Sequence, residues 1–263
     1  VLDLSSPSIV WQRTFPKDTF ARFTIDSLEQ QITVAAESHG LASLNAKNGA
    51  LLWKRPDLLI MDVAQTRDIW VLGATPPKLQ LSLFRIKPDN GLTLSQTAIQ
   101  VERASIHEFF PQQELWIVAQ NESVGHAQQI VGLNLQTGNM DWSLQHQRSP
   151  DEANDDILFI RGLDSQRFLV VYKSGKMEGR TFKDGEISWQ KRFSGFSGSW
   201  VSLLKLGKQD RLFLPDDEGA ISVFTTEGEW LSSFRLSEPT FAPQSIGEWL
   251  IFYSGNFVSA FKY

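Results

Sequence analysis

The chain has 263 residues and a formal charge of −5 at pH 7, which argues against a general nucleic-acid binder because such proteins present a basic face. It contains no cysteine, so disulfides, thiolate metal sites and cysteine nucleophiles are excluded. Its uncharged stretches are short and interrupted by polar residues, so we expect no membrane span.

A repeat runs along the sequence from about residue 30 to the C-terminus. Each copy has a short apolar run, a second short strand, a turn containing glycine, and a further strand that often carries tryptophan. The turn glycines are Gly49, Gly91, Gly138, Gly185 and Gly228. The steps between them, taken in order, are 42, 47, 47 and 43 residues. This period is typical of a four-stranded propeller blade, which has roughly 40–50 residues.

The residues within each copy favour strands joined by hairpins. The glycine follows Asn, Asp, Thr or Glu, as in Asn48-Gly49 and Asp184-Gly185, and such pairs form tight turns because glycine adopts positive φ. The apolar runs are rich in β-branched and aromatic residues, and no stretch shows sustained helical periodicity. The runs cover Gln31–Ser38, Asp68–Thr75, Glu114–Asn121, Arg167–Ser174, Arg211–Leu214 and Glu248–Tyr253.

The two ends of the chain indicate how the repeat closes. The last copy supplies only three strands, at Phe241–Ile246, Glu248–Tyr253 and Asn256–Tyr263. The N-terminal segment Ser8–Phe15 carries Trp11 and reads like residues 50–55. It therefore supplies the missing outer strand. The sequence predicts an all-β fold, a six-bladed β-propeller of four-stranded antiparallel blades closed by its N-terminal strand, with residues 1–263 as a single domain.

The repeat resembles that of quinoprotein alcohol dehydrogenase-like propellers, the pyrroloquinoline-quinone (PQQ) repeat family. The signature has an Asn or Asp, then Thr/Asn-Gly, then Trp four residues after the glycine. It is clearest in Leu44–Gly49 with Trp53 and in Leu133–Gly138 with Trp142. The third good copy, around Gly185, has lost the Asn/Asp position, and the second and fifth copies lack the tryptophan. The resemblance implies that glycine and tryptophan dock neighbouring blades, with Trp11, Trp53, Trp142 and Trp189 as the docking set.

The same resemblance does not imply that this chain binds the family's cofactor. The dehydrogenases of that family have more than six blades and use a calcium ion, an aspartate base and commonly an adjacent cysteine pair. This sequence has six units and no cysteine, and no Asp, Glu or Asn can be matched to the calcium site. We therefore expect no cofactor and assign no catalytic residue, since a widespread fold does not fix function.

Long loops on one face suggest where a partner binds. Alternate turns of a four-stranded blade lie on opposite faces, and the longer ones are Gly73–Lys78, Gln120–Gln129 and Gln145–Asp156. We expect the last two to be neighbours and to form the binding face, because loops on a rigid scaffold carry function. The candidate residues are His126, His146, Arg148, Asp151, Glu152, Asp155 and Asp156.

Simpler interpretations stand beside this one. Surface loops tolerate insertion, and the acidic run 151–156 is either a solvated loop or a set of hard oxygens for calcium. Trp70, Trp116 and Trp249 recur at one strand position, which favours blade packing over sugar stacking. Trp200 begins an inner strand and is the tryptophan whose exposure to the central channel is of interest.

The resulting functional hypothesis is a non-catalytic binding or assembly scaffold that acts in the periplasm or otherwise outside the cytoplasm. Its expected partner is another protein or a polar ligand. The alternatives are a six-bladed enzyme, either a metal-dependent hydrolase or an oxidoreductase with its site at the axial funnel, and an intracellular interaction propeller. A buried cluster of carboxylates or histidines would favour the enzyme, and an exposed apolar patch would favour the scaffold.

Overall fold

The computed structural model is all-β. It describes residues 2–3, 8–9, 11–12, 21–25, 30–36, 40–77, 80–99, 106–121, 127–147, 155–206, 209–236, 241–246, 249–253 and 257–262. Within these ranges the only helical element is a 3₁₀ turn at Pro111–Gln113. No helix among these residues is long and apolar enough to cross a membrane.

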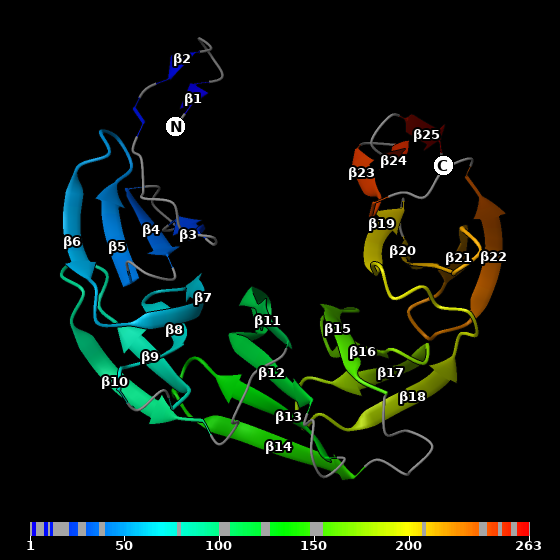
Figure 1. The fold of residues 1–263 in the computed structure, drawn as a ribbon, viewed down its shortest axis with the longest axis horizontal. Helices are drawn as coiled ribbons and strands as arrows, with labels where there is room; N and C mark the ends of the chain where they lie inside the picture. The colour runs from blue at the N-terminus through cyan, green and yellow to red at the C-terminus, as the bar shows by residue number, and fades with distance from the viewer. Residues whose placement is uncertain are drawn as a thin grey trace. The chain divides into compact units, whose positions relative to one another are not determined.

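The strands form six antiparallel sheets that correspond to the six predicted repeat units (Figure 1). Five of the sheets have four strands and the last has three, and in each sheet neighbouring strands follow one another along the chain. The predicted six-bladed β-propeller of antiparallel blades is confirmed.

Blades are numbered here in chain order, after a short N-terminal hairpin of β1 (Leu2–Asp3) and β2 (Ser8–Ile9). Blade 1 holds β3 (Ala21–Ile25), β4 (Gln31–Ala36), β5 (Gly40–Asn45) and β6 (Leu51–Arg55). Blade 2 holds β7 (Leu59–Gln65), β8 (Ile69–Ala74), β9 (Ser82–Ile86) and β10 (Thr93–Ala98). Blade 3 holds β11 (Ile106–Phe110), β12 (Leu115–Asn121), β13 (Ala127–Asn134) and β14 (Met140–Gln147).

The remaining blades follow the same order. Blade 4 holds β15 (Ile157–Gly162), β16 (Arg167–Tyr172), β17 (Lys176–Thr181) and β18 (Ile187–Arg192). Blade 5 holds β19 (Ser202–Leu206), β20 (Gln209–Pro215), β21 (Ala220–Phe224) and β22 (Trp230–Arg235). Blade 6 holds β23 (Gln244–Ile246), β24 (Trp249–Tyr253) and β25 (Val258–Lys262).

The chain divides into two compact units. The first contains residues 1–103 and 134–140, which are blades 1 and 2 with the hairpin of blade 3. The second contains residues 104–133 and 141–263, which are the rest of blade 3 and blades 4 to 6. That residues 1–263 form a single domain stays a prediction.

The apolar runs of the sequence become the buried second strands of the blades. In β8 every residue is buried, and in β16 all but the first are. Alternate residues of β16 pack to opposite sides, since Phe168 and Val170 join the cluster shared with blade 3 while Leu169 and Val171 join the cluster shared with blade 5. A strand buried on both faces needs this continuous apolar sequence.

The hairpins of blades 1 to 4 share one turn geometry. The amide of each turn glycine donates to the carbonyl four residues earlier, as from Gly49 to Asn45 at 2.8 Å and from Gly185 to Thr181 at 3.0 Å. These glycines have φ of 69° and 74°, where a side chain is strained. Asn45 Oδ1 also accepts the amides of Lys47 and Asn48 at 2.9 and 3.2 Å, which explains the asparagine of the repeat signature.

The predicted docking of tryptophan on the glycine of the next hairpin is confirmed. A Cβ atom at Gly91 would stand 2.7 Å from the ring of Trp53, and a Cβ at Gly49 would stand 2.6 Å from the ring of Trp11. The indole N–H donates to the carbonyl three residues before the glycine, with distances of 2.7 Å for Trp11, 2.5 Å for Trp53 and 2.9 Å for Trp142. Only glycine leaves room for this ring.

Blade 2 lacks the docking tryptophan, and other groups replace it. Ser95 stands at the tryptophan position, and the space over Gly138 is bordered by Ser95 Oγ and by the ring of Trp70, both about 3.5 Å from where a Cβ would be. Thr97 Oγ1 donates to the carbonyl of Gly138 at 2.6 Å. A large buried side chain from β8 therefore fills the place of the missing one.

The last blade has three strands, as the sequence predicts. Trp11 docks on blade 1 as the outer-strand tryptophan of a preceding blade would. Just before it, Ser8–Ile9 pairs with Leu2–Asp3. The predicted pairing of Ser8–Phe15 with Asn256–Tyr263 involves several positions outside the described residues and stays a prediction.

Candidate binding surfaces

The predicted binding face lies where two long loops end, around blades 3 and 4. Gln128, at the end of the first loop, donates from Nε2 to the backbone carbonyl of Asp155 at 2.7 Å, and both residues are buried. The described ends of the two loops are therefore in contact, and that the loops themselves form one face stays a prediction. The Asp155 carboxylate accepts the Ser174 amide and hydroxyl, each at 2.8 Å, and so fixes the turn between β16 and β17.

Most of the other candidate residues of this face lie outside the described part of the chain. These are His126, Arg148, Asp151 and Glu152. His146 is described in its backbone only, within β14. Asp156 is half-buried, and its backbone carbonyl accepts the amide of Lys173 at 2.8 Å. The part of these residues in binding stays a prediction.

A buried charged cluster lies on one face of β17, next to this turn. Lys176, Glu178 and Arg180 alternate along the strand, so their side chains share a face. Glu178 contacts Arg180 Nη2 at 2.7 Å and Lys176 Nζ at 3.5 Å, and it accepts the Tyr172 hydroxyl at 2.7 Å. Burial, then the charge of Glu178, raises the pKa of Tyr172 far above its ordinary value. Since Glu178 bonds all three neighbours, we assign the cluster a structural role.

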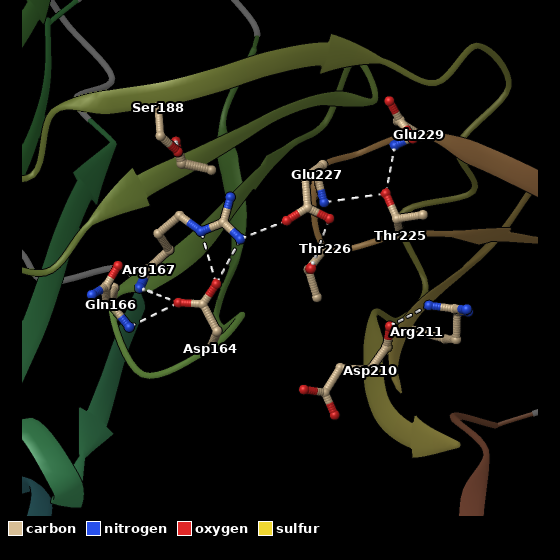
Figure 2. A network of polar contacts seen from close by, with 11 residues as sticks. Asp164, Gln166, Arg167, Ser188, Asp210, Arg211, Thr225, Thr226, Glu227 and Glu229 are labelled. Atoms are coloured by element: carbon tan, nitrogen blue, oxygen red, sulfur yellow. Dashed lines mark hydrogen bonds and ion pairs between the residues drawn. The ribbon is translucent and has the colours of Figure 1, made fainter. Parts of the chain in front are cut away.

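A second polar network joins blades 4 and 5 at their hairpin ends (Figure 2). Arg167, which begins β16, contacts Asp164 Oδ2 through Nε at 2.8 Å and Nη2 at 2.6 Å, and contacts Glu227 Oε1 through Nη2 at 2.8 Å. The hydrogen bond from Arg167 lowers the pKa of Glu227. Burial tends to raise the pKa of Asp164, but hydrogen bonds from Gln166 and Arg167 outweigh it and the net shift is downward. The network ties the blade 5 hairpin to blade 4.

The blade 5 hairpin differs from the other four. Its closing hydrogen bond runs from Thr225 N to Glu229 O, one residue shorter than the bond from Thr181 N to Glu186 O in blade 4. The carbonyl three residues before the glycine belongs to Thr225, and the Gly228 amide occupies it at 3.1 Å. Trp189 still lies on Gly228, but its Nε1 finds no acceptor among the described residues.

Outer strands share a β-bulge directly after the hairpins. In β6, Leu51 pairs with Leu44 and Trp53 with Ser43, so Leu52 is an extra residue. The same register shift makes the third residue after the glycine extra in β10, β18 and β22. Those residues are Leu94, Ser188 and Leu231. Bulges at sheet edges re-aim side chains, so these positions point differently from a regular strand.

Exposed apolar side chains gather within three residues after the hairpin glycines. Trp230 and Leu92 are both 61% exposed, and the bulge residues Leu52, Leu94 and Leu231 are 44%, 51% and 43% exposed. The complete set is Leu51, Leu52, Leu92, Leu94, Met140, Ile187, Trp230 and Leu231. Sequence analysis missed this surface. The signal was present, since each turn glycine is followed by an apolar residue at its first, second or third position.

The tryptophans singled out in the sequence divide into packing residues and an exposed one. Trp70 and Trp116 are 1% and 0% exposed, which confirms the packing interpretation for both. Trp249, in β24, is 47% exposed, and Trp200 is buried at 8% exposure. Among the described residues, the indoles that are largely exposed are those of Trp230 and Trp249, and Trp200 is not exposed to a channel.

The inner strands carry little that resembles an enzyme site within the described part of the chain. Among the described residues no group of three or more His, Asp or Glu side chains could hold a metal ion. On the inner strands of blades 3 and 4, Glu108 Oε2 and Arg161 Nη1 form an ion pair at 2.9 Å. Such a pair is half exposed and resembles a structural contact between neighbouring blades.

The similarity of this chain to known proteins identifies its fold but not its function. No protein-family model matches the chain, and no curated protein matches its sequence. Solved structures do match. Sqt1 of Saccharomyces cerevisiae gives a TM-score of 0.66 at 13% identity, covering 91% of this chain and 69% of that one. Dihydro-heme d1 dehydrogenase NirN, in complex with DHE, gives 0.64 at 17%, covering 90% and 52%.

These similarities define the chain as a β-propeller protein. The quinohemoprotein alcohol dehydrogenase ADHIIG of Pseudomonas putida HK5 also matches, with a TM-score of 0.54 at 11% identity over 80% of this chain and 41% of that one. The resemblance to quinoprotein alcohol dehydrogenase-like propellers is thus confirmed at the level of the fold. This chain spans about half or less of the two enzymes' lengths, and a shared fold does not carry their chemistry.

Proposed function

We propose that this propeller is a non-catalytic binding or assembly scaffold whose partner is another protein. The observation that carries the proposal is the series of exposed apolar side chains after the hairpins, including Trp230 at 61% exposure. Soluble proteins rarely expose large apolar patches, and tryptophan is enriched among the residues that dominate protein interfaces.

The rigidity of the hairpins supports the same function. Arg167 ties the blade 5 hairpin to blade 4, and in blade 1 Arg55 Nη1 donates to Gly91 O and Thr93 Oγ1, each at 2.9 Å, which ties it to blade 2. A surface held in place before binding loses little conformational entropy when a partner arrives. Apolar residues on such a surface therefore contribute more of their burial energy to affinity.

We further propose that the protein works outside the cytoplasm. The absence of cysteine supports this, since free thiols are oxidised in such compartments. Fractionation of cells that express the tagged full-length gene product checks the location. Recovery in the cytosolic fraction alone contradicts it.

Site-specific photo-cross-linking tests the scaffold function and locates the surface. A photoreactive phenylalanine analogue is placed at Leu52 or Leu231, at Ser188 as the matched bulge position without an apolar side chain, and at Gln145 beside the predicted loop face. We expect discrete protein adducts from positions 52 or 231 and none from 188. Adducts from 145 alone support a scaffold that uses the loop face. No protein adduct at any position overturns the scaffold function.

A further inference from the structure

The bulged leucines of the outer strands expose about half of their side chains. Leu52, Leu94 and Leu231 are the extra residues of their bulges and remain 43–51% exposed. Blade 4 has the same bulge with Ser188, which is exposed as well. The Ser188 hydroxyl donates to the carbonyl of Gly179 at 2.8 Å, so the bulge accepts a polar residue, whereas the leucines leave about half of their apolar surface in solvent.

In the first unit four exposed leucines, called the leucine strip below, lie on or directly before the neighbouring outer strands of blades 1 and 2. Trp53 packs on Gly91, so β6 lies against the hairpin that continues into Leu92. Two residues of strand span about 7 Å, so Leu51 lies that far from Trp53 along β6, and Leu94 lies equally far from Leu92 along β10. The strip of Leu51, Leu52, Leu92 and Leu94 is thus on the order of 20 Å long, the length of about 13 residues of α-helix.

The charges around this leucine strip are basic, although the whole chain is acidic. Residues 46–57 and 87–98 contain four basic and two acidic residues, against a net charge of −5 for the chain. Both acidic residues are paired, Asp57 with Arg55 at 2.7 Å and Asp89 with Lys87 at 3.5 Å. Lys47 and Lys54 are exposed and form no ion pair with another described residue. The strip therefore complements a partner that is apolar and negatively charged.

We propose that the leucine strip binds an acidic amphipathic helical segment of another polypeptide, with its apolar face on the four leucines and its carboxylates toward Lys47 and Lys54. This rests on the proposed scaffold function and specifies one partner chemistry for it. A helix presents apolar residues at intervals of three and four on one face, which matches a strip of this length.

Binding of designed peptides tests the proposal directly. The probe is a fluorescein-labelled synthetic helix of about 18 residues with leucine on one face and glutamate on the other, followed by fluorescence anisotropy on the full chain. We expect saturable binding that weakens at least tenfold when lysine replaces glutamate in the peptide, and that weakens with added salt. Equal binding of the two peptides, or no saturation, overturns the proposal.

Variants of the protein locate the binding. Leu52→Ser with Leu94→Ser should weaken peptide binding at least tenfold, and Lys47→Glu with Lys54→Glu should do the same. Val258→Ser, at a 74% exposed position in β25 that does not follow one of the five turn glycines, is the control and should leave the affinity unchanged. All variants should melt like the parent, because every altered side chain is exposed. An affinity lost equally in the control places the peptide elsewhere and refutes the assignment.

Two further experiments test whether the strip binds a lipid surface or a second copy of this chain. Phosphatidylglycerol vesicles that bind the protein through the same leucines, while the acidic peptide does not, would replace the proposed partner with a lipid surface and overturn it. Self-association of the protein that disappears in the Leu52→Ser, Leu94→Ser variant would show that the strip binds a second copy of this chain, and this too would overturn the proposal. If the peptide fails while photo-cross-linking from Leu231 yields a protein adduct, the scaffold function stands and the acidic partner does not.

Discussion

Replacing Trp142 by alanine tests whether the indole rings hold the blades together. Trp142 is 9% exposed, stacks on Phe168 with ring centres 6.0 Å apart and planes at 9°, and donates from Nε1 to the carbonyl of Phe182 at 2.9 Å. Its ring also covers Gly185 and Gly132. The change removes the ring from the junction of blades 3 and 4 and leaves that carbonyl without its donor.

The expected loss is large relative to the stability of a domain. Tryptophan-to-alanine changes in a core cost about 3–5 kcal/mol because the cavity does not collapse fully. Native proteins unfold at a cost of only about 5–15 kcal/mol. For Trp53, which is only partly buried, we expect the lower end of the range.

Urea denaturation followed by far-ultraviolet circular dichroism measures the effect. With a slope of about 3 kcal/mol per molar urea, the Trp142→Ala midpoint should fall by about 1 M or more. Trp230→Ala is the matched control, since Trp230 is 61% exposed and should change stability by less than about 0.5 kcal/mol. A loss below about 1 kcal/mol at Trp142, or an equal loss at both positions, would refute the docking role.

Four more results are expected. Arg167→Gln should destabilise at neutral pH, and in pH-dependent melts the difference from the parent should shrink as pH falls below about 4 and vanish only once both carboxylates are protonated, because the folded-state pKa values of Glu227 and Asp164 are both lowered and protonation ends their ion pairs with Arg167; a constant difference would contradict this. Asp155→Ala should cost about 1–3 kcal/mol in urea titrations because two donors of Ser174 lose their acceptor, and no loss would mean that solvent replaces it. Deleting residues 1–16 should cause aggregation or a marked fall in melting temperature if the N-terminal strand completes blade 6; an unchanged melt would sink the closure. Titration with pyrroloquinoline quinone and calcium should give no saturable one-to-one absorbance change, and such a change would overturn the non-catalytic interpretation.

The regular part of the fold could be predicted because it repeats. Glycine at a positive φ recurs in all five hairpins, and tryptophan follows four residues later in blades 1, 3 and 4, so the series of turn glycines from Gly49 to Gly228 marks the period. The buried strands were equally visible, since a strand packed on both faces requires a continuous apolar run. These features depend on local sequence and on contacts that recur from blade to blade.

The surfaces could not be predicted in the same way because they depend on departures from the repeat. The shorter hairpin of blade 5 shows only in the hydrogen bond from Thr225 to Glu229, and the bulge at Leu52 appears only in the strand register. Asp155 looked like a surface acid in the sequence, yet its carboxylate is buried against Ser174. Neighbouring charge in a sequence does not reveal which side chains a loop turns inward.

Two positions after each hairpin, the tryptophan position and the bulge position, differ in what determines the residue found there. The tryptophan position faces the next blade, where packing determines its identity, and blade 2 has Ser95 there because the ring of Trp70 fills the space. The bulge position faces solvent, and Ser188 demonstrates that the backbone accepts a polar residue there. Exposed leucine at Leu52, Leu94 and Leu231 therefore requires a reason outside the fold. Burial against a partner supplies that reason, because it removes apolar surface that the folded chain alone leaves in water.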